Sequence, residues 1–192
     1  LYKMKTQKRQ ISFLEASEVR KIIDNIKPEG ARNLRDRALL ETLFSTGLRI
    51  GEALALSLNE MILLILDDQS VGTSELPVIG KGGWQRVVYF SPKAKKAIKE
   101  YMAVRTDTSE YLFPLTSRGA QKMVKERTKE AGVMKRVTPH VFRHSLATDL
   151  LRKGVDIAFV SKFLGHRSLN NTMIYTHVVN NDLKDIHKKL YK

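Results

Sequence analysis

The sequence predicts an α+β fold that is mainly α-helical and contains a small three-stranded antiparallel sheet. Apolar residues recur at helical spacing through most of the chain, as in the stripe formed by Val19, Ile22, Ile23 and Ile26. Between residues 61 and 90 the pattern changes to short apolar runs of strand length, separated by turn residues. With 192 residues, 42% of them hydrophobic, the chain can bury one sizeable core.

The predicted domain covers residues 11–179 and is flanked by two short tails. Residues 1–10 carry Lys and Arg but no acidic residue, and we interpret them as a basic linker or tail. Residues 180–192 are expected to form a tail helix, because their apolar residues share one helical face. This face can pack either against its own chain or against a neighbouring protomer. The chain opens on Leu1 rather than Met, as expected of a piece of a longer protein.

A helix expected over residues 32–44 ends near Gly47, because glycine readily adopts the left-handed conformation of a helix C-cap. Arg49 follows at the start of the next expected helix. Flanked by two apolar residues, its side chain is expected to be partly buried, and a buried Arg requires an anionic partner. Glu52, three residues later, can be that partner within the protein, and an anionic ligand is the alternative.

Three candidate strands make up the predicted sheet, at residues 61–66, 76–79 and 86–90. The last two are joined by the glycine-rich turn at 80–83, whose glycines allow close approach to another backbone. Lys81 would present a mobile positive charge at the tip of this hairpin. An ordinary exposed turn lysine is the alternative interpretation.

The charge balance indicates a nucleic-acid partner. Thirty-four Lys and Arg against 20 Asp and Glu give a formal net charge of +14. A membrane is less consistent with the sequence, because no apolar run approaches the roughly 20 residues that a spanning helix needs. We predict DNA contacts for basic residues of the last strand and of a helix expected before Gly132, namely Arg86, Arg118, Lys122 and Lys125. A merely solvated face is the alternative for such charges.

A helix expected to begin at Thr138 concentrates cations and imidazoles in its first turns. Thr138 and Pro139 are typical of the N-cap and the first helical position. His140 and Arg143, three residues apart, share one face of the first turn, and His144 follows directly. The free backbone amides at a helix N-terminus also favour a bound anion.

The segment after this helix adds a histidine and a tyrosine. Gly165 is expected to close a short helix, and His166 is the next residue. Tyr175 lies nine positions beyond His166, on a helix expected over residues 172–177. Together with His140 and Arg143, these residues form a cluster suited to an anionic ligand.

Metal, nucleotide and thiol sites do not fit this sequence. His140 and His144 have the spacing of a helical metal-binding pair, but Val141 replaces the expected Glu and Arg143 would repel a cation. The turn at 80–83 lacks the spacing and the hydroxyl of a Walker loop. Because the sequence has no Cys, disulfides and thiolate sites are excluded, which is compatible with a reducing, cytoplasmic setting. We expect neither a metal nor another cofactor.

Taken together, the segments resemble the tyrosine recombinases of the phage integrase family, near the Xer-type members. The resemblance covers about residues 11–179 and implies the catalytic-domain fold of that family. The chain departs from the family pattern at Gly51, where Ser is commoner, and in the turn at 69–75. The matching strings are TGLRIGEALAL at 46–56, IGKGGWQRVV at 79–88, TPHVFRHSLATDLL at 138–151 and LGHRSLNNTMIYTHV at 164–178.

The resemblance implies an enzyme that cuts and rejoins DNA, with Tyr175 as the nucleophile. Tyr175 would form a 3′-phosphotyrosyl link and release a 5′-hydroxyl, while Arg49 and Arg143 would hold the phosphate oxygens. Physical chemistry is consistent with these roles. A free tyrosine has a pKa near 10 and needs activation at neutral pH, and bidentate arginines can stabilise charge on phosphate oxygens.

The remaining implied roles are proton transfer, phosphate binding and ordering of the site. Lys81 corresponds to the general acid for the leaving oxygen, His140 to the proton-transfer histidine near the nucleophile, and His166 to a second phosphate donor. Glu52 corresponds to a partner that orders the site. The family also usually has an N-terminal DNA-clamping domain, which this sequence lacks.

The implied partner is double-stranded DNA, on which the protein would assemble as a homo-tetramer. The implied role is integration or excision of a mobile element, or chromosome dimer resolution. A catalytically silent DNA-binding regulator would lose catalytic residues, whereas all six are present here. A type IB topoisomerase shares the chemistry but not the Xer-like spacing. A basic binding module without activity is a further alternative.

Overall fold

The computed structural model describes residues 12–66, 74–80, 83, 85–166 and 168–175, and the two predicted tails lie outside these ranges. Nine helices and two strands are found within them. In chain order they are α1 (Ala16–Asp24), α2 (Gly30–Thr46), α3 (Ile50–Leu54), α4 (Leu58–Leu66), β1 (Ser74–Ile79), β2 (Gln85–Phe90), α5 (Pro92–Met102), α6 (Ser117–Glu130), α7 (Pro139–Arg152), α8 (Ile157–Leu164) and α9 (Asn170–Met173).

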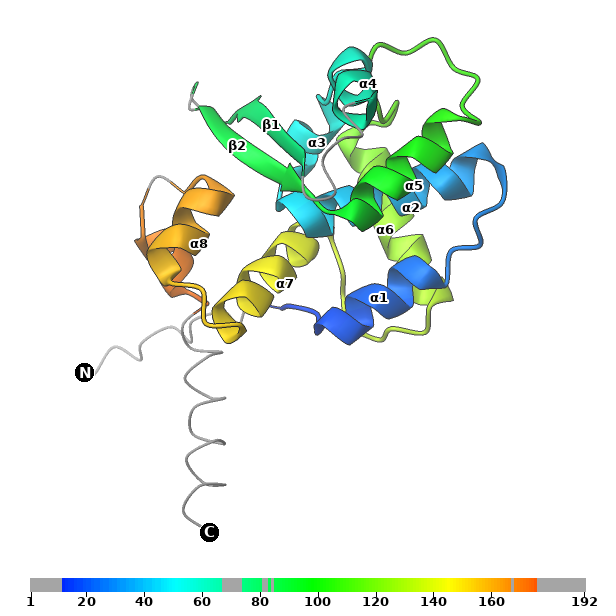
Figure 1. Ribbon diagram of the computed structural model, residues 1–192. Coiled ribbons are helices and arrows are strands. Elements are labelled where there is room, and N and C mark those ends of the chain that lie inside the picture. The colour runs from blue at the N-terminus through cyan, green and yellow to red at the C-terminus, as the bar shows by residue number, and fades with distance from the viewer. Residues whose placement is uncertain (1–11, 67–73, 81–82, 84, 167, 176–192) are drawn as a thin grey trace, which may run out of the picture.

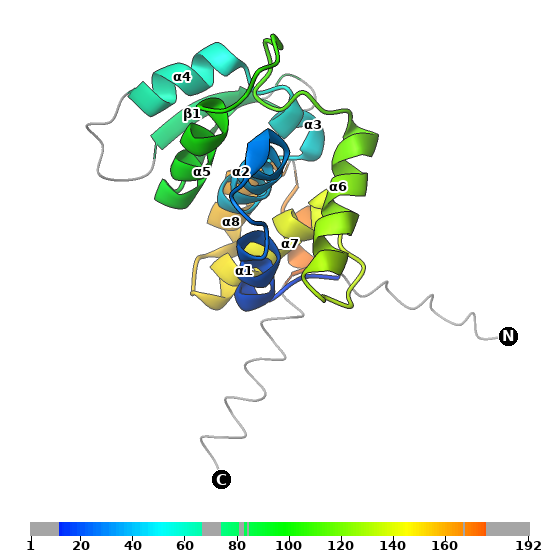
Figure 2. The same cartoon turned by 90° about the vertical axis from the view of Figure 1, so that its right-hand side faces the viewer.

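Helix α2 lies at the centre of the helical part, as Figure 2 shows, and packs against α1, α3, α5, α7 and β2. Its inward side is fully buried at Ala38, Leu39, Leu40 and Leu43. The apolar stripe predicted for the first helix is also buried. Burial of such side chains is the main favourable term in folding, at about 25 cal/mol per Å² of apolar surface. The central helix therefore forms the scaffold on which the surrounding elements are placed.

The sheet has two antiparallel strands within the described residues, so the prediction of three strands is wrong. β1 and β2 pair in register from Ser74 opposite Phe90 to Ile79 opposite Gln85. Figure 1 shows this hairpin beside α4 and above α8.

The predicted first strand, residues 61–66, is instead part of helix α4. Ser57 and Glu60 form a reciprocal capping pair, in which the Glu60 backbone N–H donates to Ser57 Oγ (3.5 Å) and the Ser57 N–H to the Glu60 carboxylate (3.3 Å). Met61 and Leu64, three residues apart, are buried, whereas Leu63 is exposed. A nearly continuous apolar run hides this helical period, so the cap was the better signal.

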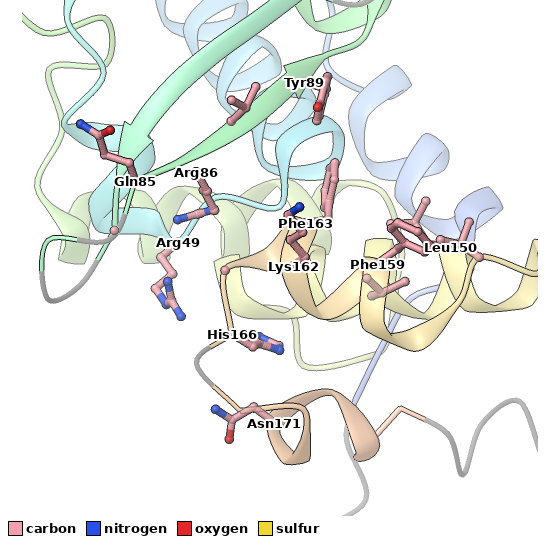
Figure 3. Close-up of a pocket in the computed structure, with 15 residues that line it drawn as sticks. Arg49, Gln85, Arg86, Tyr89, Leu150, Phe159, Lys162, Phe163, His166 and Asn171 are labelled. Carbon is pink, nitrogen blue, oxygen red and sulfur yellow. The ribbon is translucent and has the colours of Figure 1, made fainter.

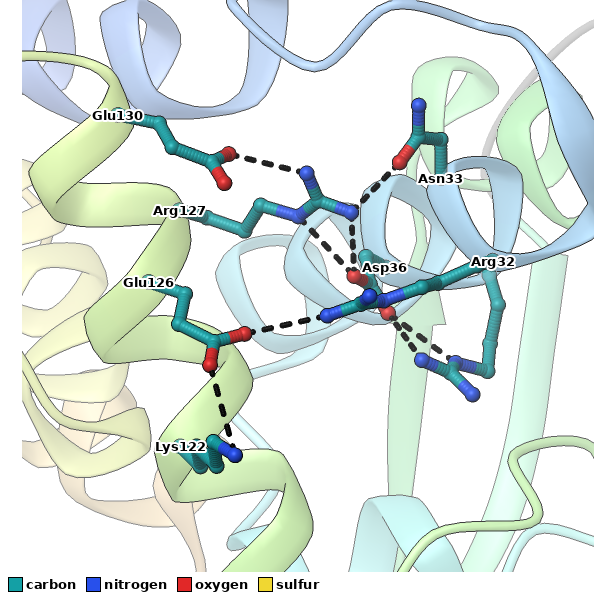
Figure 4. A network of polar contacts seen from close by, with 8 residues as sticks. Arg32, Asn33, Asp36, Lys122, Glu126, Arg127 and Glu130 are labelled. Atoms are coloured by element: carbon teal, nitrogen blue, oxygen red, sulfur yellow. Dashed lines mark hydrogen bonds and ion pairs between the residues drawn. The ribbon is translucent and has the colours of Figure 1, made fainter.

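A buried ion-pair cluster around Asp36 joins α6 to α2 (Figure 4). The fully buried Asp36 carboxylate accepts hydrogen bonds from Arg127 at 2.8 and 3.0 Å and from Arg35 at 2.7 Å. Arg127 also donates to Asn33 (2.6 Å) and Glu130 (3.0 Å). Paired buried charges of this kind are costly to break singly, because the remaining charge is left without a partner.

A second, smaller apolar cluster is formed by residues of α7, of α8 and of the turn after α9. It consists of Ala147, Val160, Leu164 and Tyr175. Tyr175 lies in the turn after α9, whose range differs from the predicted helix at residues 172–177. The Tyr175 backbone N–H donates to the Thr172 carbonyl at 3.0 Å, which closes that turn.

Candidate active site

Arg143, in the first turns of α7, links two glycine turns. Its Nη1 donates to the Gly47 carbonyl and its Nη2 to the Leu164 carbonyl, both at 2.5 Å. Gly47 and Gly165 are the C-caps of α2 and α8, with φ of 61° and 65°, the left-handed region that favours glycine. The Arg143 side chain is therefore buried and held by segments far apart in the sequence. Among the described residues, the hydrogen bonds of Arg143 use two of its five N–H donors, which leaves donors for an anion.

The pKa of Arg143 is lowered to about 10, first by burial and then by the nearby positive charges of Arg49 and Arg86. The guanidinium remains charged at neutral pH. Three arginines thus lie close enough to repel one another. An anion bound among them would relieve this repulsion.

Glu52 is the acidic residue that these arginines share. At the start of α3, the Arg49 backbone N–H donates to Glu52 Oε2 at 2.8 Å and its Nη1 to Oε1 at 2.9 Å. Arg86, on β2, approaches from the other side, with Nη2 to Oε2 at 2.7 Å and Nη1 to Oε1 at 3.2 Å. Burial, the largest influence, raises the pKa of Glu52, but the bonds from Arg86 and Arg49 together lower it to about 2. The carboxylate is ionised at neutral pH.

Tyr175 is almost completely buried, and its hydroxyl is bound to His144. Tyr175 Oη lies 2.5 Å from His144 Nδ1, and the tyrosine is 1% exposed. Burial, followed by His140 and Arg143, lowers the pKa of His144 to about 4, so the imidazole is neutral at neutral pH. Burial also raises the pKa of Tyr175, against an opposing effect of Arg143. Both groups are therefore neutral at neutral pH, and the tautomer of His144 decides which of them donates the hydrogen bond.

His140 and His166 both lie near His144. The rings of His140 and His144 are stacked, with centroids 6.5 Å apart. His166 Nδ1 is 2.7 Å from Thr172 Oγ1. Burial, then Arg143 and Arg49, lower the pKa of both His140 and His166, that of His166 to about 4. Each is neutral at neutral pH and can still donate one N–H to a ligand.

A cleft of about 1330 Å³ opens between β2 and α8 beside these groups. Figure 3 shows Arg49 and Arg86 toward one end of it and Phe159 and Leu150 toward the other. His166 also lines it. The cleft is therefore positively charged at one end and apolar at the other.

The structure brings together five of the six predicted catalytic residues, Arg49, His140, Arg143, His166 and Tyr175. Lys81 lies outside the described residues. The predicted DNA contacts fall into two groups. Arg118, Lys122 and Lys125 are exposed on α6, whereas the Arg86 side chain is only 10% exposed and is directed at Glu52.

His144 is the residue of this site to which the sequence assigned no role. Its position, four residues after His140, places both imidazoles on one face of α7. That spacing was the available signal. It could not reveal the contact with Tyr175, because the partner is 31 residues away in sequence.

Two absences hold for the residues that the structure describes. No group of three or more His, Cys, Asp and Glu side chains lies together in a way that could hold a metal ion. None of the described helices combines the length and the apolar character needed to cross a membrane.

A mainly helical fold with arginines and histidines gathered around a buried tyrosine defines a recognised class of proteins. The chain belongs to the phage integrase family, whose sequence model, described as "Phage integrase family", matches residues 12–182. This match spans both ends of the site, from Arg49 to Tyr175.

Xer-type recombinases are among the proteins similar to this chain. Tyrosine recombinase XerC of Halalkalibacterium halodurans is 35% identical over 193 residues, which cover 92% of this chain and 61% of that protein. Tyrosine recombinase XerD of Corynebacterium glutamicum is 37% identical over 187 residues, which cover 90% and 59%. The chain thus spans about three fifths of the length of these curated relatives.

Solved structures show the same fold. The XerH site-specific recombinase bound to its palindromic difH substrate, in a post-cleavage complex, has a TM-score of 0.79 and 26% identity. That match covers 96% of this chain and 54% of the XerH chain. The XerA recombinase has a TM-score of 0.74 and 26% identity, covering 98% of this chain and 66% of the other.

Proposed function

We propose that residues 11–179 are the catalytic domain of a tyrosine-type site-specific recombinase, which cuts and rejoins DNA through a covalent link to Tyr175. The observation that carries this proposal is the convergence of Arg49, Arg143 and His166 on the surroundings of a hydrogen-bonded tyrosine. Arg143 lies in α7, whereas Arg49 is the N-cap of α3, His166 follows α8 and Tyr175 lies in the turn after α9. Positive charge without a matching number of acidic groups suits a phosphodiester.

In the proposed cleavage step, Tyr175 Oη attacks the scissile phosphorus and loses its proton to a neighbouring histidine. The bond from phosphorus to the 5′-oxygen breaks, and that oxygen takes a proton from Lys81, the residue that corresponds to the family's general acid. The products are a 3′-phosphotyrosyl link and a free 5′-hydroxyl. Attack by another 5′-hydroxyl reverses the step, and no ATP is needed because the link conserves the phosphodiester bond energy.

Arg49 and Arg143 would stabilise the charge that develops on the non-bridging oxygens. Arg143 is already fixed by two backbone carbonyls, so it needs no reorganisation when the phosphate arrives. Arg49 is more accessible, with a third of its side chain exposed. One arginine would therefore be preorganised, and the other would close on the substrate.

The proposed partners are double-stranded DNA and further copies of this chain. The XerH relative was crystallised with its difH substrate before and after cleavage, which supports a DNA substrate here. The exposed basic side chains of α6 would contact the DNA backbone. We also propose that tail residues 180–192 dock on a neighbouring protomer of a tetramer. Deletion of residues 181–192 is expected to weaken assembly on DNA in analytical ultracentrifugation, and unchanged assembly would contradict it.

The proposal is tested by trapping the covalent intermediate. A pool of labelled duplexes with randomised sequence, each carrying one nick, is incubated with the protein in EDTA and then denatured. We expect a denaturation-resistant protein–DNA band from the wild type and none from Tyr175→Phe, although the variant still binds the duplexes. An equally strong band from Tyr175→Phe would exclude Tyr175 as the nucleophile.

A further inference from the structure

Arg86 contacts both halves of the site. On one side its two terminal nitrogens bind the two oxygens of Glu52, which also holds Arg49. On the other side its side chain packs on Gly165, the residue before His166. A Cβ built at Gly165 would lie 2.8 Å from Arg86 Cδ, closer than real Cβ atoms approach, and 3.1 Å from its Nε, which is a tight contact.

The strand geometry explains why Arg86 is directed inward. Successive side chains of a strand point to opposite faces, so Arg86 shares its face with Val88 and Phe90. Both of these are fully buried. Arg86 therefore extends the inner face of β2, lines one end of the cleft and binds Glu52 with its guanidinium. A residue that served mainly to contact DNA would instead be expected on the exposed face, with its guanidinium free.

The contact between Arg86 and Glu52 affects the position of the Arg49 guanidinium through the charge of Glu52. Glu52 is ionised, and its pKa of about 2 has bonds from Arg86 as the largest lowering influence. With Arg86 present, both carboxylate oxygens have a partner other than the Arg49 side chain. Without Arg86, the Arg49 guanidinium would be the remaining cation on a half-buried carboxylate. It would then be drawn toward Glu52 and away from a phosphate.

We propose that Arg86 is a positioning residue, which fixes Glu52 and the Gly165 turn so that Arg49 and His166 face the same phosphate. This inference rests on the proposed strand-cleavage function. It differs from our prediction from sequence that Arg86 contacts DNA, and the two interpretations predict opposite effects on binding and on rate.

The test measures adduct formation and DNA affinity separately on the nicked duplexes selected with the wild type. Arg86→Met keeps the stem that packs on Gly165 and removes the charge. We expect its adduct rate at saturating DNA to fall about 10²-fold, the typical effect of a small misplacement in a site, with little change in the apparent Kd. Arg86→Lys, which restores one donor but not the fork, should recover part of the rate. Lys153→Met, an exposed lysine paired with Asp149, controls for the loss of one positive charge.

Glu52→Gln provides the second arm. If Arg86 acts through Glu52, adding Arg86→Met to Glu52→Gln should lower the rate by no more than about threefold, because interacting residues are not additive. The inference is overturned if Arg86→Met weakens binding but leaves the saturated rate unchanged, or if the two substitutions multiply fully. Normal binding by Arg86→Met shows that the variant is folded. Failure of the wild type to form any adduct would instead reject the proposed function.

Discussion

Two arginine clusters in this protein differ in how far their positive charges are balanced by acidic residues. Around Asp36, the cations Arg32, Arg35, Lys122 and Arg127 meet the acids Asp36, Glu126 and Glu130, so that nearly every charge has a partner. In the site, the acid shared by Arg49 and Arg86 is Glu52, and Arg143 bonds to backbone carbonyls. The first cluster joins helices, and the second retains an excess of positive charge at a cleft. Charge balance, rather than the number of arginines, distinguishes a structural cluster from a ligand site.

The largest expected effect is that of Arg143→Lys, a substitution in the cluster at the cleft, on the rate of adduct formation. Arg143→Lys cannot bridge the Gly47 and Leu164 carbonyls with a planar fork. We expect the rate of covalent adduct formation to fall by about 10²–10³-fold, as for loss of one preorganised donor. Quantification of the adduct band over time measures this. A rate within a few-fold of the wild type would show that the fork is dispensable.

Substitutions in the cluster around Asp36 should lower the stability of the protein and leave the adduct rate unchanged. Asp36→Asn leaves Arg127 and Arg35 around a neutral side chain, and breaking a buried ion pair in this way costs about 3 kcal/mol or more. Urea unfolding should show this loss, while the adduct rate of the folded fraction stays unchanged. Arg32→Ala breaks the exposed pair with Glu126 and should cost about 1 kcal/mol or less. Equal losses from both variants would remove the distinction between buried and surface pairs.

Stability should also respond to acid. Folding lowers the pKa of His144 and His166 from 6.5 to about 4, so the unfolded chain binds protons more readily. The stability they contribute is present above pH 6.5 and is lost as the pH falls from 6.5 to about 4. Glu52, lowered from 4.5 to about 2, contributes stability above pH 4.5 that is lost below it.

Urea unfolding between neutral pH and about pH 4 measures this dependence. His144→Phe should flatten part of the decline, because one of the two imidazoles is removed. A stability that stays constant over the range, or an undiminished slope in the variant, would contradict the burial of these histidines as neutral rings.

Much of the site could be predicted because its residues lie at helix boundaries that have local signals. Thr138 and Pro139 mark the start of α7, and Gly47 and Gly165 mark the ends of α2 and α8, as the structure confirms. These boundaries place Arg49, Arg143 and His166 beside turns. Local sequence contains that information.

The features that could not be predicted depend on contacts between distant segments or on sequence patterns without a visible period. The run at 61–66 is too uniformly apolar for its helical period to appear, so it was interpreted as a strand. The direction of Arg86 follows from burial of Val88 and Phe90, which the alternation of β2 could have indicated. The contact of His144 with Tyr175 has no local signal.

The two carbonyls held by Arg143 have a consequence during synthesis of the chain. One belongs to Gly47 and the other to Leu164, and the tyrosine follows at position 175. A nascent chain released before Leu164 would have a centre built around α2, but it would lack the second carbonyl, His166 and Tyr175. Long-range contacts of this kind form late, after their separate segments exist. If the proposed function holds, incomplete chains would form no covalent link to DNA, because Tyr175 is added only when the last part of the domain has been made.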